Sequence, residues 1–157
     1  MAQKHDHKNC MSGVEARADA GFTARGMKMT PLRRQVLATI ASSHDAVGAY
    51  EVVERIAKKD GRRLAPVSVY RIIDSLMDIG VVHKLESRQA YYACHGDHAL
   101  GRQVALVCRI CAHVAEIDGQ EVLAGITSQA SRRSFRAESV LVEVLGLCRN
   151  CDRAPSK

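Results

Sequence analysis

Two pairs of cysteines, each spaced as Cys-x-x-Cys, are the residues of this 157-residue chain best suited to chemistry. The first pair lies in "LVCRICAHVAEI" and the second in "LCRNC", with 36 residues between them. Each pair can form a tight turn that presents two thiolates, and two such turns can surround one ion as a tetrahedron. The spacing therefore predicts a structural zinc site whose four ligands leave no open position: Cys108, Cys111, Cys148 and Cys151.

Three other interpretations compete with zinc: two disulfides, four unliganded cysteines, or a thiol redox switch. The chain has no apolar run long enough to span a membrane, and its N-terminus lacks the apolar region of a signal peptide. We therefore expect a cytoplasmic protein with no membrane partner. Disulfides are rare in that compartment, so zinc is the favoured occupant of the two pairs.

A second group of potential metal ligands lies around the middle of the chain and around the first cysteine pair. Its members are His83, Cys94, His95, His98, His113 and Glu116. A set of His83, Cys94, His98 and Glu116 would make a formally neutral site with Zn²⁺. Removing zinc from such a site costs less free energy than removing it from four thiolates. Its one thiolate favours zinc over iron. Because these ligands come from both halves of the chain, binding would fix one half relative to the other, as a metal switch requires. The competing interpretation is that each is an ordinary surface or core residue.

A first short helix is expected over about residues 13–25, and local signals predict three more helices in the first half that position these ligands. "MTPLRRQVLATIASS" has Thr30 as N-cap and Pro31 in the first turn, and "GAYEVVERIAKKDG" ends at Gly61. "APVSVYRIIDSLMDIG" opens at Pro66 and closes at Gly80. The β-like runs "VVHKLE" and "AYYAC" follow, separated by "SRQ". Three helices and a hairpin are typical of a winged helix-turn-helix.

The third of these helices enters the DNA major groove in that architecture. Ser68, Tyr70 and Arg71 project from its first turns, and the arginine fork matches two acceptors of guanine. Residues 1–90 carry 15 Lys/Arg against 10 Asp/Glu, whereas residues 91–157 carry 8 against 7. The basic first half indicates a polyanionic partner. Charge alone leaves open the alternative of an ordinary solvated basic surface. For Arg71, the predicted hairpin and the basic balance together outweigh the alternative of an ordinary surface arginine.

The second half has a different pattern. "QVALVC" and "HVAEI" resemble adjacent strands, and "SVLVEVLGLC" a third that runs into the second cysteine pair. "DGQEVLAGITSQASRR" resembles a helix whose Val122, Leu123, Ile126 and Ala130 should face inward. So few strands leave open edges, and a homodimer would cover them. We thus expect an α+β protein with three parts: a flexible tail (1–12, with possible loose ligands His5, His7 and Cys10), a winged helix (13–87) and a small α/β dimerisation domain (88–157).

Several motifs together are similar to the ferric uptake regulator (Fur) superfamily of bacterial metal sensors, and most of all to its zinc-uptake (Zur) branch. They are "MTPLRRQVL", "GAYEVVERI", "VSVYRIIDSLMDIGVVHKLES", the first Cys-x-x-Cys with Glu five residues after it, and "GLCRNC". The resemblance covers about residues 13–151. It implies a dimeric repressor with a structural zinc at the four cysteines and a sensed zinc at a second site.

The resemblance assigns His83, Cys94 and Glu116 to the sensing site, with a fourth ligand from the histidines after Cys94. His98 is the first choice and His95 the reserve. It matches Tyr70 and Arg71 to the recognition helix and Tyr50 to a position near DNA. Two departures stand out: "HALGRQVALVC" replaces a histidine-rich run, and Ala112 replaces a common glycine.

The resulting hypothesis is a zinc-responsive repressor rather than an enzyme. Two zinc ions per chain would lock the dimer on a palindromic double-stranded operator and silence zinc-uptake genes. An iron, manganese or peroxide sensor of the same superfamily is the alternative, and Cys94 argues against it. A zinc deaminase would need His-x-Glu and Pro-Cys-x-x-Cys, and the sequence contains neither. We expect no small-molecule substrate.

Overall fold

The computed structural model describes residues 7–61, 64–94 and 103–153, and the chain divides into two compact units, 1–95 and 96–157. Each unit is described by itself. The division falls after the hairpin, whereas the boundary expected between 87 and 88 lies in the turn that joins its two strands. No helix in the described part of the chain has both the length and the apolar character needed to cross a bilayer.

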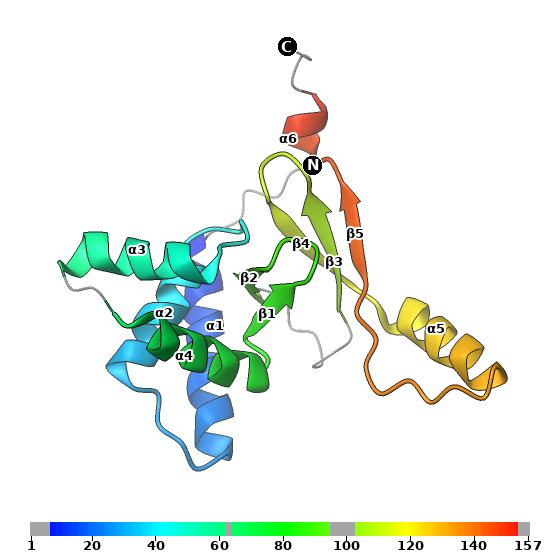
Figure 1. Ribbon diagram of the computed structural model, residues 1–157, viewed down its shortest axis with the longest axis horizontal. Helices are drawn as coiled ribbons and strands as arrows, with labels where there is room; N and C mark the ends of the chain where they lie inside the picture. Colours follow the sequence, from blue (N-terminus) through cyan, green and yellow to red (C-terminus); the bar gives the residue numbers. More distant parts are fainter. Residues whose placement is uncertain (1–6, 62–63, 95–102, 154–157) are drawn as a thin grey trace. The chain divides into compact units, whose positions relative to one another are not determined.

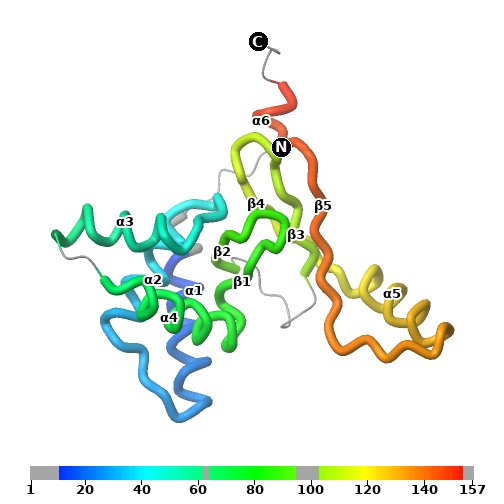
Figure 2. The backbone as a smooth tube through the Cα atoms, viewed as in Figure 1, coloured from blue at the N-terminus to red at the C-terminus, as the bar shows by residue number. Residues whose placement is uncertain are grey.

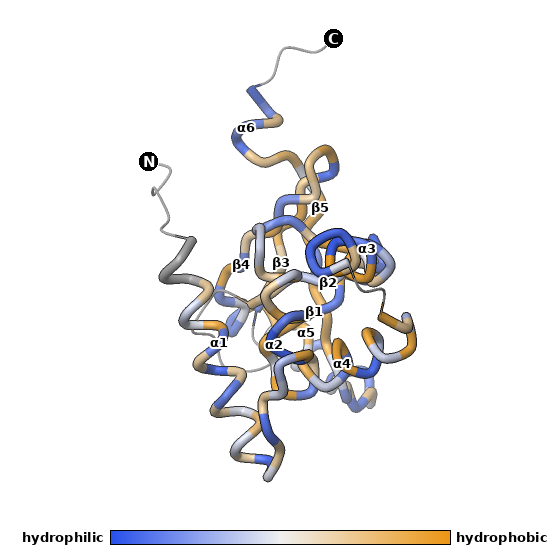
Figure 3. Tube along the Cα trace, turned by 90° about the vertical axis from the view of Figure 1, so that its left-hand side faces the viewer, coloured by the Kyte–Doolittle hydropathy of each residue, from blue (hydrophilic) through white to orange (hydrophobic). Residues whose placement is uncertain are grey.

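The first unit contains four helices and a hairpin (Figure 1). The helices are α1 (His7–Ala24), α2 (Pro31–Ile40), α3 (Ala49–Asp60) and α4 (Pro66–Asp78). Helix α1 begins at His7, inside the stretch expected to be a flexible tail, and residues 1–6 lie outside the described residues. Hydrophobic and hydrophilic residues alternate along these helices, as expected of elements that bury one face (Figure 3).

The predicted helix signals have the expected geometry. The hydroxyl of Thr30 accepts a hydrogen bond from the backbone N–H of Arg33 at 3.3 Å, and Pro31 opens α2. Gly61 ends α3 in the left-handed conformation, with φ of 65°, which glycine adopts at little cost. These local signals fix where the helices begin and end, so their apolar faces meet in one core.

The core of the first unit joins one face of every helix to the hairpin. Phe22 of α1, Leu37 of α2, Ile56 of α3 and Ile73 of α4 are fully or almost fully buried. Burial of each such side chain contributes about 1.5–3 kcal/mol. The buried residues of α3 are Ala49, Val52, Val53 and Ile56, whereas Leu32 of α2 and Ile72 of α4 are only partly buried.

The hairpin consists of β1 (Val82–Leu85) and β2 (Ala90–Ala93), paired antiparallel. His83 lies opposite Tyr92 in this register, and Val47 adds a bridge to Tyr91 that local sequence did not predict. Side chains two residues apart on a strand share a face. Cys94 lies two residues beyond Tyr92, so the register directs His83 and Cys94 to the same side of the hairpin.

The second unit contains a three-stranded sheet in the order β4-β3-β5. Its strands are β3 (Gln103–Cys108), β4 (Val114–Asp118) and β5 (Glu143–Gly146). Strands β3 and β4 are antiparallel, whereas β5 pairs with β3 in parallel. Helix α5 (Gln120–Arg132) and the short α6 (Arg149–Asp152) complete the unit. Figure 2 traces the long return from α5 to β5, which lets the two neighbouring strands run in parallel.

The predicted inward face of α5 is wrong for the chain by itself. Val122 is 50% exposed and Ile126 41%, and Leu123 and Ala130 are only partly covered. Figure 1 shows the helix standing away from the sheet of its own unit. The apolar stripe does exist, but no described element of this unit covers it, so the helix needs another surface to bury it.

Candidate metal centres and nucleic-acid interface

The first cysteine pair forms a turn at the end of β3. Cys108 is the last residue of that strand, and its backbone N–H donates to the carbonyl of His113 at 2.9 Å. The N–H of Ala112 donates to the carbonyl of Cys108 at 3.1 Å. Ala112 has φ of 61°, which is costly for a residue with a Cβ and explains why glycine suits this position. The turn brings the two sulfurs of the pair to one side.

The second pair begins after β5, where Cys148 precedes the short helix α6. The N–H of Cys151 donates to the carbonyl of Cys148 at 3.0 Å. The N–H of Arg109 donates to the carbonyl of Gly146 at 2.9 Å, and Cys108 and Gly146 are register partners. Parallel pairing of β3 with β5 therefore places the ends of both strands, and so both cysteine turns, side by side.

The four cysteines predicted from spacing come together as predicted. Their sulfur atoms lie within 4.8 Å of one another, and the sulfurs of Cys111 and Cys148 are 3.7 Å apart. A zinc ion with four sulfurs at about 2.3 Å requires sulfur–sulfur edges of about 3.8 Å. A disulfide would need about 2.05 Å, and all four cysteines are free thiols here. The donor set and its spacing fit a tetrahedral zinc ion.

The thiols of this cluster differ in how readily they ionise. Hydrogen bonds from the backbone at Cys111 and Cys148 lower the pKa of Cys108 to about 6. Desolvation raises the pKa of Cys151 to about 12, and the neighbouring sulfurs of Cys111 and Cys148 contribute to this rise as smaller causes. Four thiolates this close repel one another, so a cation is needed to hold all four ionised. The four sulfurs could hold a divalent metal, whose charge would balance theirs.

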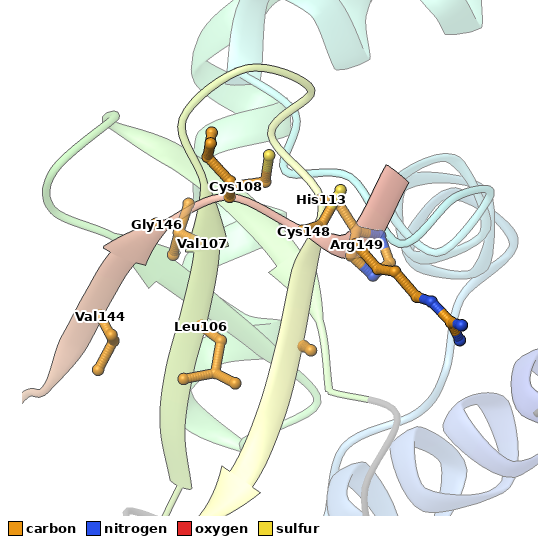
Figure 4. Close-up of a pocket in the computed structure, with 10 residues that line it drawn as sticks. Leu106, Val107, Cys108, His113, Val144, Gly146, Cys148 and Arg149 are labelled. Carbon is orange, nitrogen blue, oxygen red and sulfur yellow. The ribbon is translucent and has the colours of Figure 1, made fainter. Parts of the chain in front are cut away.

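A cavity of about 380 Å³ borders the cysteine cluster (Figure 4). Side chains of β3 and β5, such as Leu106 and Val144, supply its apolar wall, and His113, Cys148 and Arg149 line its other side. On one side, then, the metal centre adjoins an apolar hollow of its own unit.

Two ligands predicted for the second metal lie together on the hairpin of the first unit. His83 belongs to β1, and Cys94 follows β2 and is 4% exposed. Their ligand atoms lie within 4.8 Å of each other. The His83 ring also contacts the ring of Tyr92 at a centroid distance of 5.6 Å, which limits its rotation. An imidazole and a thiolate at this separation can bind the same zinc ion.

The remaining predicted ligands are placed less completely. Glu116 lies in β4 of the second unit, half-buried and opposite Ala105 of β3. His98 and its reserve His95 lie outside the described residues, as does His5. The backbone of His7 and Cys10 belongs to α1. Membership of Glu116 and His98 in the second site stays a prediction.

The four residues predicted to meet DNA lie at the start of α3 and α4. Tyr50 is 68% exposed, and its ring meets that of Tyr70 edge-on at 6.4 Å. Arg71 is exposed and Ser68 partly so. Val67 lies in the same first turn, is 58% exposed, and was not among the residues predicted from the sequence, although its position outside the buried stripe was an available signal. An apolar side chain there suits the methyl group of thymine.

Comparison with known proteins gives a consistent result. The family model described as "Ferric uptake regulator family" matches residues 24–145. The zinc uptake regulation protein of Escherichia coli strain K12 is 28% identical over 137 residues, which cover 87% of this chain and 80% of that protein. The protein of the same name from Mycobacterium tuberculosis H37Rv is 26% identical, over 83% of this chain and 98% of that protein.

Solved structures agree in fold. The crystal structure of holo XcZur has a TM-score of 0.79 at 35% identity, over 92% of this chain and 99% of that chain. A zinc uptake regulator complexed with zinc and DNA has a TM-score of 0.80 at 26% identity, over 95% of this chain and 97% of that chain. Because the family model spans most of the chain, this chain belongs to the ferric uptake regulator family.

Proposed function

We propose that this chain is a cytoplasmic, zinc-responsive transcriptional repressor. Its homodimer, with two zinc ions per chain, binds a palindromic operator in double-stranded DNA and represses genes for zinc uptake. The relatives named as zinc uptake regulators, and the one solved with zinc and DNA, support this assignment. The observation that carries it is the placement of His83 beside Cys94 on the wing of the DNA-binding unit.

The choice of zinc over other metals rests on Cys94. Its buried thiol lies within 4.8 Å of a histidine nitrogen, and thiolate with imidazole suits zinc. Manganese prefers oxygen ligands, which this pair does not supply. We assign Glu116 and His98 as the other two regulatory ligands. The alternative, a sensor of iron, manganese or peroxide, would require a removable site that prefers a metal other than zinc.

The homodimer rests on apolar side chains of the second unit that its own described elements leave exposed. Leu141 is 73% exposed, Leu145 52% and Val144 48%, in addition to the stripe on α5. These residues lie in and just before β5, one of the two edge strands of the described sheet. A second copy of the chain would cover such a surface and present two recognition helices to two operator half-sites.

The proposed switch acts through the population of DNA-competent dimers. When the regulatory ligands hold zinc, the winged helices are held at the spacing of the two half-sites. Without zinc they are free to move, and operator affinity falls. Moving a dimer from 1% to 99% competent requires the metal to favour the competent state by about 5.5 kcal/mol.

The test is metal counting combined with operator binding. The wild-type protein should carry two zinc ions per chain, lose one to a mild chelator, and lose operator binding with it. Zinc should restore binding, whereas iron(II) and manganese(II) should not. The variant Cys94→Ser should lose only the removable ion. The matched control is Cys10→Ser, which changes the one cysteine outside the two proposed zinc sites. A single ion per chain, or a removable site that prefers iron, would refute the proposal.

A further inference from the structure

The backbone of Cys94 is anchored by a residue far away in the sequence. A guanidinium nitrogen of Arg17, on α1, donates to the carbonyl of Cys94, 77 residues later. On its other side, the N–H of Cys94 donates to the carbonyl of Val81 at 3.0 Å. Both peptide groups that flank the Cα of Cys94 are thereby held, which restricts where its sulfur can lie.

Helix α1, which carries Arg17, is fixed to the rest of the unit at two further places. Arg34 of α2 pairs with Glu15 at 3.3 Å and with Asp19 at 3.2 Å, on either side of Arg17 along the helix. Surface ion pairs contribute little to stability, but two from one guanidinium define the position of the helix. Arg17 therefore reaches Cys94 from a support that is itself held in place.

The C-terminal end of α1 packs on the C-terminal end of α4. Arg25 donates to the carbonyl of Asp78, the last residue of α4. A Cβ added at Gly21 would lie 3.0 Å from the Cβ of Ile79, so backbone and side chain meet closely there. One helix thus contacts both the end of the recognition helix and the carbonyl of a regulatory ligand.

We propose that Arg17 is a positioning residue for the regulatory zinc: by holding the Cys94 carbonyl it presents the thiolate beside His83 before the metal arrives. This inference rests on the proposed function, because it assumes that the His83–Cys94 pair binds zinc. Groups that orient a metal ligand without touching the metal change its affinity by about 10–100-fold. Losing the Arg17 bond should lower the zinc affinity of the removable site by about tenfold or more.

The experiment compares Arg17 of α1 with Arg25, the first residue after α1, because each side chain donates to a backbone carbonyl. Arg17→Met removes the donor to Cys94, and Arg25→Met removes the donor to Asp78, away from the metal ligands. Zinc affinity of the removable site is measured in the full-length protein by competition with a chromogenic chelator. Cobalt(II) substitution reports the thiolate-to-metal charge-transfer band, and thermal unfolding reports stability.

We expect Arg17→Met to weaken the removable zinc about tenfold or more and to reduce the cobalt–thiolate band, while the four-cysteine ion stays bound. Arg25→Met should leave zinc affinity unchanged even where it lowers the melting temperature, and Arg17→Lys should recover part of the affinity. Equal affinities for Arg17→Met and wild type, or equal losses for both methionine variants, would overturn the inference while leaving the proposed function intact. A wild-type protein without a removable zinc would instead refute the proposed function, and the inference with it.

Discussion

Removal of the ion from the four-cysteine site should unfold the second unit and leave the winged helix folded. The perturbation is Cys151→Ser, or a chelator strong enough to empty the site. Between residues 103 and 153 the buried hydrophobic residues are few, and none of them lies in α5 or β5. They are Val104, Ala105, Val107, Cys108 and Val114. The first unit has a much larger buried core of its own.

The magnitudes show which contribution dominates in the second unit. A fully buried valine contributes about 1.5–3 kcal/mol, so its three buried valines together supply less than about 10 kcal/mol before any entropy is counted. A structural zinc contributes about 10–16 kcal/mol of apparent binding free energy. Total domain stabilities are about 5–15 kcal/mol. The free energy lost with the ion should therefore exceed the stability that the sheet and its core supply. The sheet adds little, since β5 pairs with β3 over only four residues.

The assay is calorimetric unfolding with limited proteolysis, on protein whose metal content has been counted. In the zinc-loaded protein, both units should resist proteolysis and show an unfolding transition. Cys151→Ser should lose the transition of the second unit and expose residues 103–153 to protease, while the first unit keeps its own transition. Cys10→Ser should behave as wild type. If the emptied protein kept an unchanged second transition and remained protease-resistant, the sheet would be stable without metal, and the reasoning about its small core would be wrong.

Three further predictions follow from single positions. Ala112→Gly should stabilise the zinc-loaded second unit by about 1 kcal/mol, since φ of 61° costs a residue with a Cβ about 1–2 kcal/mol; thermal unfolding measures this. Arg71→Ala should weaken operator binding by about 1–3 kcal/mol and relax base preference at one position per half-site, measured with single-base operator variants. Gly21→Ala should destabilise the first unit by about 1–3 kcal/mol, because its Cβ would lie 3.0 Å from that of Ile79; denaturant unfolding measures this.

The first unit was largely predictable because its local and long-range signals agree. Thr30 and Pro31 start a helix whose apolar face also fits the core, and Gly61 ends the next one where the chain must turn. The extra bridge from Val47 to Tyr91 was not predictable, since a single paired residue leaves no periodic pattern. The early start of α1 at His7 was missed because the polar residues there resemble a tail.

The second unit was less predictable because its own described elements leave much of its apolar pattern exposed. The stripe of Val122 and Ile126 correctly indicated an amphipathic helix, but periodicity cannot say which surface will cover it. The strongly apolar run before Cys148 yields only a four-residue strand, β5. Apolar residues in that run remain exposed in the single chain, which is consistent with a segment selected to contact another copy.

The two metal sites differed in predictability for a geometric reason. Each Cys-x-x-Cys turn is local, so spacing alone brings its sulfurs together, and only the parallel register of β3 and β5 had to be supplied by the fold. His83 and Cys94 are brought together by hairpin register, which the sequence specifies through its short turn. Nothing local in the sequence indicated that Arg17 would reach the carbonyl of Cys94.

The chemistry of the two sites also explains why one metal should be permanent and the other removable. In the cysteine cluster the pKa of Cys108 is lowered and that of Cys151 is raised, so the four sulfurs cannot all ionise unless a cation balances them. Losing that ion makes some of the sulfurs take up protons and removes the link between the two cysteine turns, so the small core alone must hold the second unit folded. The proposed regulatory set needs a single thiolate, Cys94, in a hairpin whose pairing does not depend on metal. Under the proposed function, emptying it would leave the winged helix folded, so that zinc there could vary with supply and control DNA binding without unfolding the protein.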